Sequence, residues 1–395
     1  MLKIEHLTKT YGGKPAVQDL CLHIRPGELC AFIGHNGAGK TTTLKCCCGI
    51  QQFDAGEIYV DGISVWENPL ECKRRLAYLP DDPQLYDYMT GIQYLDFIAD
   101  IFGVSTAQRA QRIRQYGDAF VLTQDLAQSI GAYSHGMKQK LAIIAALLHE
   151  PKLILMDEPF VGLDPLASHQ LKTQMKAFCA QGGAIFFSTH VLEVAEKLCD
   201  RVAILRKRSA GARGCYGRGA RRRYAGGGLS GTGGYGGSAM IRALLKKQLL
   251  ELGAAFVRSS KTGKRRSRAG AFGYALLFAA LMLLVMLNFG SMALPLAVTL
   301  VPQGLDWLYF VLMELSALTV SVLASAFTSY GHLFRCRDNQ QLLALPIPPG
   351  AIFAVRCGGV YLTGLIYLLL AWVPSVVCYA LAAPRPGVPC WRRCR

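Results

Sequence analysis

One short segment combines glycines, a lysine and a threonine at a spacing that suits phosphate binding. Gly34–Thr41 reads GHNGAGKT and fits G-x-x-x-x-G-K-[ST], with an apolar, β-prone run before it and helix-compatible residues after it. Glycines let backbone N–H groups curl around phosphates, and a helix N-terminus adds partial positive charge. The lysine reaches the β- and γ-phosphates of ATP, and the threonine ligates Mg²⁺. The sequence therefore predicts a nucleotide-binding loop that consists of Gly34, His35, Asn36, Gly37, Ala38, Gly39, Lys40, Thr41 and Thr42.

Two acidic residues end a second apolar run. Lys152–Pro159 reads KLILMDEP, which is typical of a buried strand that delivers carboxylates at its carboxyl end. Ligands of doubly wound sheets bind beyond those strand ends. We expect Asp157 to hold Mg²⁺ through water and Glu158 to act as the general base toward the attacking water. Many strands end in Asp only as a helix cap, so the phosphate loop upstream is what favours a catalytic role.

A capped helix provides the third motif. Tyr133–Leu148 reads YSHGMKQKLAIIAALL and places Ser134 at the N-cap of an apolar helix. The segment resembles the signature motif of ATP-binding cassette (ABC) ATPases, whose usual form is LSGGQ. Ser134 and Gly136 match that form, whereas His135 and Met137 depart from it. The resemblance implies that the matching serine and glycine grip the γ-phosphate of ATP held by an opposite subunit.

Further segments resemble the other motifs of this family, in the family's order, between residue 1 and about residue 205. Tyr11 matches the aromatic residue that stacks on adenine. Asp164, in GLDP, resembles the D-loop residue that faces the partner subunit. His190, in STH, matches the switch histidine that contacts the γ-phosphate. The resemblance therefore implies ATP and Mg²⁺ as cofactors and a second ABC ATPase subunit as partner.

One position departs from the family pattern. The family usually has a Mg²⁺-contacting glutamine shortly after the strand that ends here at Leu79, but this sequence has Asp81. A carboxylate also ligates Mg²⁺ through water, so we include Asp81 among the metal-site residues with Thr41 and Asp157. Gln84 is the less favoured substitute.

The elements that must position these residues lie in a chain of two unlike halves. The chain has 395 residues, of which 52% are hydrophobic, with a net charge of +17. Up to Leu205 there are 19 Lys and Arg against 22 Asp and Glu, and the remaining residues carry 24 against 4. The first half is predicted to be an α/β P-loop NTPase with a helical subdomain over Gly91–Leu126. The 14 cysteines show no zinc-like spacing and are expected to be reduced thiols.

The second half is predicted to be an α-helical transmembrane region. Ala271–Phe289, Leu305–Tyr330 and Val355–Ala383 are apolar and long enough to cross a hydrocarbon core. Arginines and lysines precede the first run and surround the loop between the second and third, while the loop around Pro302–Asp306 has none. The positive-inside rule then places the ATPase half in the cytoplasm of a multi-pass cell-membrane protein.

Two segments beside these runs are predicted to be helical. Met240–Leu252 is amphipathic, which suits an interfacial helix before the first span, although a core helix has the same pattern. Phe334–Ile352 resembles the cytoplasmic coupling segment of an exporter-type ABC permease. Such a permease usually has about six spans, so residues 240–383 represent a partial permease domain.

Two basic segments fit neither half. Residues 206–239 are rich in Gly and Arg without Asp or Glu, and residues 384–395 carry four arginines, again without an acid. We interpret 206–239 as a disordered junction and 384–395 as a basic tail. The composition and position of both segments favour the hypothesis that two adjacent genes were joined by a frameshift and the second was truncated by another.

The sequence thus predicts an ABC transporter component that hydrolyses ATP to drive export of an unidentified substrate, with permease spans in cis or in a separate chain. A soluble ABC ATPase that acts on nucleic acid or the ribosome is the alternative, because the Gly/Arg-rich stretch is basic. The apolar runs argue against it, so no nucleic-acid partner is expected. A frameshifted fusion that retains only ATP binding is the third interpretation.

Overall fold

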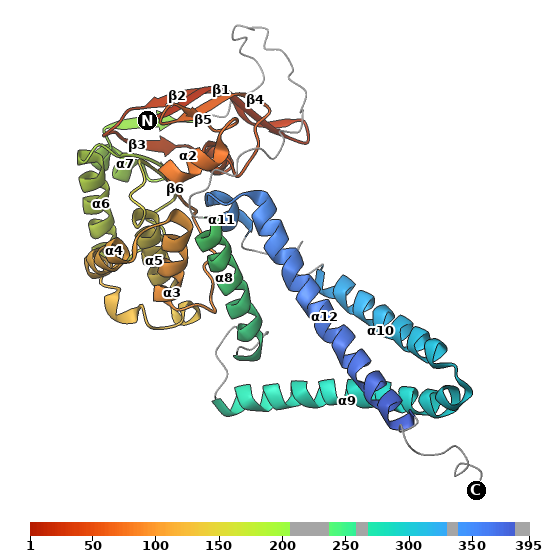
Figure 1. The fold of residues 1–395 in the computed structure, drawn as a ribbon. Helices are drawn as coiled ribbons and strands as arrows, with labels where there is room; N and C mark the ends of the chain where they lie inside the picture. The colour runs from red at the N-terminus through yellow and green to blue at the C-terminus, as the bar shows by residue number, and fades with distance from the viewer. Residues whose placement is uncertain (206–236, 258–267, 330–338, 384–395) are drawn as a thin grey trace. The chain divides into compact units, whose positions relative to one another are not determined.

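The computed structural model describes residues 1–205, 237–257, 268–329 and 339–383 (Figure 1). The chain divides into two compact units, one of residues 1–247 with 338–349 and one of residues 248–337 with 350–395. The predicted junction and tail lie outside the described residues, except that the first three residues of helix α8, Gly237–Val257, fall within the predicted junction.

The first unit contains an antiparallel sheet built from the start of the chain. Strands β1 (Leu2–Tyr11), β2 (Lys14–Ile24), β4 (Ala55–Val60) and β5 (Ile63–Ser64) pair in the order β2-β1-β4-β5. Alternating residues of β1 are buried, as expected for a strand with one face on a core. The pairing of β1 with β2 is interrupted by register shifts.

A five-stranded parallel sheet lies beside it in the same unit. Strands β3 (Leu29–Ile33), β6 (Leu76–Leu79), β7 (Leu153–Asp157), β8 (Ala184–Thr189) and β9 (Arg201–Ile204) pair in the order β6-β7-β8-β3-β9. Strands β7 and β8 are buried throughout, which explains their continuous apolar sequence. A core cluster that includes Leu2, Phe32, Leu44 and Phe186 joins the two sheets and α1 (Lys40–Cys47).

Helices complete the unit (Figure 1). Those between residues 69 and 198 are α2 (Pro69–Arg75), α3 (Gly91–Phe102), α4 (Thr106–Ala119), α5 (His135–Leu147), α6 (Pro165–Ala180) and α7 (Leu192–Leu198). Thr90 and Gln93 form a capping box at the start of α3, which ends at Gly103 in the left-handed conformation. The predicted helical stretch Gly91–Leu126 therefore corresponds to α3, α4 and a short 3-10 turn, Thr123–Asp125.

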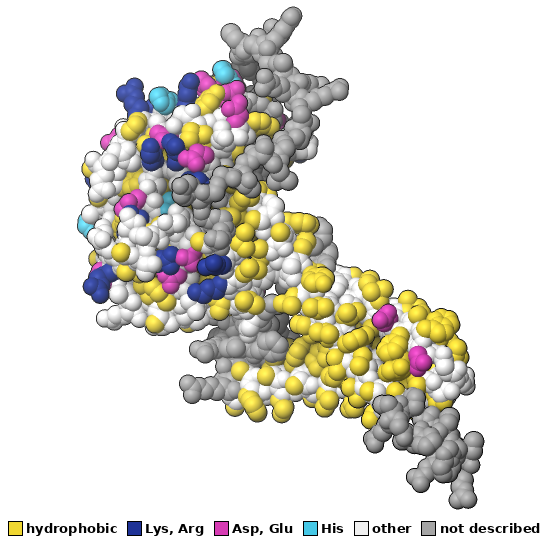
Figure 2. Space-filling model, viewed as in Figure 1, with side chains coloured by type: hydrophobic (Ala, Val, Ile, Leu, Met, Phe, Trp, Pro, Cys, Tyr) yellow, Lys and Arg dark blue, Asp and Glu magenta, His cyan; other side chains and the backbone are white. Residues whose placement is uncertain are grey.

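Long apolar helices form the second unit. Helices α9 (Arg268–Leu300), α10 (Asp306–Ser329) and α12 (Pro349–Ala382) are long and apolar enough to cross a membrane. Hydrophobic side chains cover much of their visible surface (Figure 2). Around a small buried cluster, the Tyr309 hydroxyl donates to the Ser375 carbonyl at 2.7 Å. The first helix extends well beyond the predicted run, which ended at Phe289.

Candidate nucleotide-binding site

The phosphate loop joins β3 to α1, and its backbone depends on glycine. Gly39 has φ 104°, and a Cβ there would lie 2.4 Å from the Ala16 carbonyl oxygen on β2. Any other residue would meet both a disfavoured conformation and that carbonyl. Helix α1 begins at Lys40, directly after Gly39, and the first N–H groups of a helix have no partner within it, so they are available to an anion in the space that the loop encloses.

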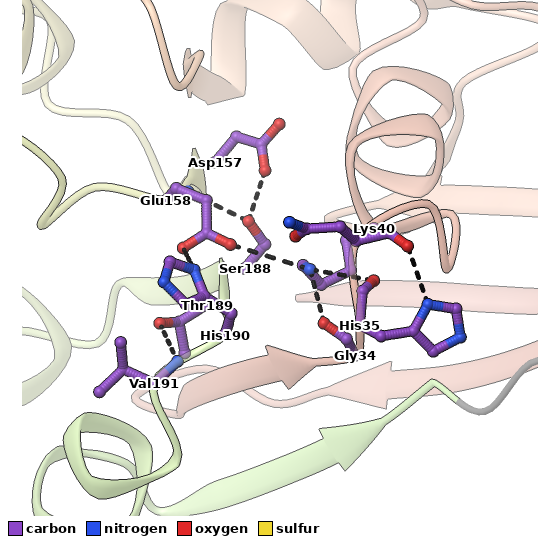
Figure 3. Close-up of polar contacts among 10 residues, drawn as sticks. Gly34, His35, Lys40, Asp157, Glu158, Ser188, Thr189, His190 and Val191 are labelled. Carbon is purple, nitrogen blue, oxygen red and sulfur yellow. Dashed lines mark hydrogen bonds and ion pairs between the residues drawn. The ribbon is translucent and has the colours of Figure 1, made fainter.

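Lys40 crosses this space. Its side chain is largely buried, and its Nζ donates to the Gly34 carbonyl at 2.7 Å and lies 3.5 Å from the His35 carbonyl. The same Nζ lies 3.8 Å from Glu158 Oε1 (Figure 3). The ammonium is thus held between the loop and the acid that follows β7.

Asp157 ends β7 and is 1% exposed. Ser188, its neighbour in register on β8, donates its hydroxyl to Asp157 Oδ1. Burial raises the pKa of Asp157 above its usual value, the hydroxyls of Ser188 and Thr41 oppose this, and the charges of Asp81 and Glu158 raise it further. Its Oδ2 has no hydrogen-bond partner among the described residues.

These features fit a divalent cation. A buried carboxylate oxygen without a partner, a threonine hydroxyl beside it and a second acid within electrostatic range form an all-oxygen donor set. Mg²⁺ prefers such hard oxygen ligands and commonly keeps several waters. A cation here would compensate the cost of burying the ionised Asp157.

Glu158 follows directly and has an unusual backbone. Its φ of 46° lies in the left-handed region, which non-glycine residues adopt at a cost, often at functional sites. The Glu158 N–H donates to Ser188 Oγ at 3.0 Å, which holds this turn on the end of β8. The carboxylate thereby points between Lys40 and His190, whose Nδ1 lies 3.0 Å from Glu158 Oε2 (Figure 3).

The remaining predicted residues divide into two places. Tyr11 ends β1 and is half exposed, with Lys9 Nζ 5.3 Å from its ring centre, in the hairpin whose other strand touches Gly39. Ser134 instead caps α5 by accepting from the Met137 N–H at 3.3 Å.

Asp164 caps α6, accepting from the Ala167 N–H at 2.7 Å, and lies 3.2 Å from Lys140 Nζ. Gly136 lies close enough to this turn that a Cβ on it would come within 3.0 Å of the Gly162 carbonyl. The ring of His135 packs against Gly162, where an added Cβ would lie 2.3 Å from His135 Cδ2.

The signature-like and D-loop-like residues are therefore neighbours. No hydrogen bond or ion pair between described residues joins Ser134, Gly136 or Asp164 to Lys40, Asp157 or Glu158. The predicted residues thus form two groups, one around the phosphate loop and one at the starts of α5 and α6.

Sequence reasoning missed Ser188. It is fully buried and connects Asp157 to the backbone of Glu158. The STH segment drew attention only to His190. A parallel alignment of the β7 and β8 sequences at their carboxyl ends would have placed a hydroxyl opposite the acid.

The fold and the loop define a P-loop nucleoside triphosphatase. The family described as ABC transporter matches residues 17–161. The ABC transporter ATP-binding protein YxlF of Bacillus subtilis is 37% identical over 206 residues, 52% of this chain and 68% of the relative. The ABC-type transporter ATP-binding protein EcsA of the same organism is 34% identical over 214 residues, 54% of this chain and 87% of the relative.

One solved structure, described as the ATP-binding subunit of an ABC transporter, is 38% identical. It superimposes with a TM-score of 0.51 over 52% of this chain and 85% of that one. The chain belongs to the ABC transporter family, through an ATP-binding domain in its first half. It is therefore an ATP hydrolase of the ABC type, and the predicted P-loop ABC ATPase fold is confirmed.

Proposed function

We propose that this chain couples ATP hydrolysis to export of a substrate across the cytoplasmic membrane. The observation that carries the proposal is the pairing of a complete phosphate-loop site with three helices long and apolar enough to span a membrane. ABC ATPases work as dimers and with permease components, and ABC transporter relatives are membrane-associated. This chain combines an ATP-binding domain with apolar helices of its own.

In the proposed reaction, the loop N–H groups and Lys40 hold the β- and γ-phosphates. Thr41, Asp157 and Asp81 hold Mg²⁺, which neutralises charge on the phosphate oxygens when bound. Glu158 accepts the proton of the water whose oxygen attacks the γ-phosphorus, and ADP leaves. Ser188 fixes the two acids relative to each other, and His190 holds the Glu158 carboxylate through its Oε2 and would face the γ-phosphate.

A second subunit follows from the two groups of site residues. Ser134, Gly136 and Asp164 lie at helix starts, where backbone N–H groups favour an anion, and have no polar contact with the phosphate loop of their own chain in the described part. We propose that they complete the ATP site of a homodimeric or related partner cassette. Tyr11 would stack on the adenine of the ATP bound by its own loop.

The described part of the predicted coupling segment, Phe334–Ile352, supports a role in coupling the ATPase to the apolar helices. Helix α11 (Asn339–Ala344) belongs to the same compact unit as the ATPase residues, and Leu342 and Ile347 are buried there. Lys247, in the same unit, places its Nζ 4.8 Å from the ring centre of Tyr86. We propose that these segments transmit closure of the cassettes to the apolar helices, as permease spans in cis.

The helix before the first apolar run keeps its amphipathic role in this proposal. In α8, Ile241, Leu245 and Leu249 are exposed, whereas Ala243 and Leu244 are buried. An exposed apolar row suits the membrane interface rather than a core helix. The lysine- and arginine-rich flanks support the proposal that the ATPase lies on the cytoplasmic side.

The test compares the purified full chain with two variants on helix α1 and one variant of the acid that follows β7. Lys40→Ala should abolish MgATP binding, while Lys45→Ala, in the last turn of α1, should leave it unchanged. Glu158→Gln should bind MgATP but lose hydrolysis by about 10²-fold or more. Equal MgATP binding by the wild type and Lys40→Ala would refute the nucleotide site.

The membrane part has a separate readout. We expect the full chain to remain in the pellet when membranes are extracted at alkaline pH, because three long apolar helices cannot be solvated in water. Release into the soluble fraction would refute membrane insertion while leaving the ATPase assignment intact. In that case, a chain that retains only ATP binding, or a soluble ABC ATPase, becomes the better interpretation.

A further inference from the structure

Bulges shape the surface of the β1–β2 hairpin, outside the nucleotide site. The pairing shifts register between Ile4 and Leu7, between Leu7 and Lys9, and between Lys9 and Thr10. His6 on β1 and Asp19 on β2 both have left-handed backbones, with φ of 51° and 50°. Such bulges re-aim side chains, and the strained residues they contain often have a function.

The bulges bring three potential metal ligands together. His6, Asp19 and Cys21 are exposed, and one ligand atom of each lies within 4.8 Å of the others. His6 Nδ1 lies 2.7 Å from Asp19 Oδ1 and 3.8 Å from Cys21 Sγ. Both partners thus face the same ring nitrogen.

That convergence distinguishes the cluster from a catalytic relay. In a nucleophile–histidine–carboxylate triad, the acid and the nucleophile face opposite nitrogens of the imidazole, so that a proton passes through the ring. Here, a nucleophilic role for Cys21 has no second nitrogen to use. Three donor atoms around one point are instead the arrangement of a metal site.

The donor types and distances suit zinc. Zn²⁺ binds cysteine sulfur at about 2.3 Å and histidine nitrogen or carboxylate oxygen at about 2.0–2.1 Å, in tetrahedral geometry. Those bond lengths separate neighbouring ligand atoms by about 3.3–3.6 Å. The distances from His6 Nδ1 to the other two donors, 2.7 and 3.8 Å, bracket this range, and all three ligand atoms lie within 4.8 Å of one another.

The surroundings also favour a bound cation. The His6 N–H lies 3.3 Å from Cys21 Sγ and donates to it, an outer contact of the kind that orients ligating sulfur. Asp19 makes its one ion pair within the described residues with His6. A thiolate and a carboxylate would balance the charge of Zn²⁺ with a neutral imidazole, leaving water as the fourth ligand.

We propose that His6, Asp19 and Cys21 form a surface binding site for Zn²⁺ that joins β1 to β2. Cys21 is the one exposed cysteine among those described, while Cys46, Cys47 and Cys48 are buried. The site lies close in sequence to the phosphate loop's support, because Val17 packs near Gly39 two residues before Asp19. Zinc binding therefore stabilises the strand on which the loop rests.

The test uses the full chain after removal of bound metal with a chelator. Titration with Co²⁺ should produce the near-ultraviolet band of a cobalt–thiolate bond at one equivalent, and Zn²⁺ should displace it. Cys21→Ser should abolish the band, and His6→Gln and Asp19→Asn should each weaken affinity at least tenfold. The matched control is His23→Gln, which replaces an exposed histidine on β2, the strand of Asp19 and Cys21. This variant should bind metal as the wild type does.

A measurement without substitution protects the test against misfolded variants. Zn²⁺ should slow the reaction of Cys21 with a thiol reagent in the wild-type chain and should raise its Tm as the metal concentration increases. An unchanged labelling rate at saturating Zn²⁺, or a cobalt–thiolate band that persists in Cys21→Ser, would overturn the proposal.

Discussion

Replacing Asp157 by Asn should stabilise the nucleotide-free fold while it removes Mg²⁺-dependent hydrolysis. The carboxylate is buried at the end of β7, and one of its oxygens has no partner among the described residues. Burial raises its pKa above the usual 3.8. An acid whose pKa is raised by folding binds its proton more tightly in the folded state. The folded state therefore loses stability as the pH rises from the unfolded pKa toward the folded one.

The size of the expected stability gain follows from the burial of the Asp157 carboxylate. The wild type carries the whole penalty at a pH above the folded-state pKa of Asp157, where the carboxylate is ionised in both states. A pKa that folding raises by one unit corresponds to about 1.4 kcal/mol of lost stability for the ionised group. Asn removes the buried charge and keeps an oxygen that accepts from Ser188, so we expect a gain of about 1–2 kcal/mol. For a domain of this size, that corresponds to a rise in Tm of about 2–8 °C.

Thermal unfolding of the full chain in detergent, without nucleotide and with chelator, measures the effect. Asp164→Asn is the control, and it should lower the Tm. The Ala167 N–H and Lys140 lower the pKa of Asp164, so the charge of this carboxylate stabilises the fold. MgATP should raise the Tm of the wild type more than that of Asp157→Asn. A lower Tm for Asp157→Asn than for wild type, in the absence of Mg²⁺, would refute the reasoning.

Three further outcomes are expected. Ser188→Ala should lower kcat about tenfold or more with little change in ATP affinity, because it removes two hydrogen bonds that position the acids. Steady-state ATPase assays measure this effect, and an unchanged kcat would contradict the prediction. Gly39→Ala should lose nucleotide binding and more than about 1 kcal/mol of stability, because the new side chain combines φ 104° with a Cβ 2.4 Å from a carbonyl oxygen. Equilibrium nucleotide binding and chemical denaturation measure the two losses. Gly62→Ala, in an open turn where a Cβ meets no atom within 4 Å, is the control. Burial lowers the pKa of His149 to about 4, so the folded state should lose stability as the pH falls from 6.5 toward 4, and His149→Gln should flatten this dependence of Tm on pH.

Much of the nucleotide site was predictable because its geometry follows from local sequence. A glycine loop between an apolar strand and a helix leaves few alternatives to a phosphate loop, and KLILMDEP places its acids at a buried strand end. Ser188 was not predictable from its own neighbours, because its role depends on the register of β7 against β8. Only pairing between distant segments makes its hydroxyl face Asp157.

The β1–β2 hairpin and the apolar helices show two other limits of prediction from the sequence. Cysteine spacing gave no zinc-like pattern, since His6 and Cys21 meet only through the pairing of β1 with β2 and through register shifts that no simple alternation indicates. The apolar runs predicted three long helices, but not their ends, because helices continue past the most hydrophobic residues. Helix α9 begins at Arg268 and continues to Leu300.

The packing of His135 against Gly162 makes the two positions mutationally interdependent. While a histidine ring fills the space over Gly162, a side chain at position 162 needs both a displaced ring and a left-handed backbone. A return of position 135 to the glycine that is usual in the family would vacate that space. The order in which substitutions can accumulate is therefore constrained: position 135 must become small before position 162 can become large.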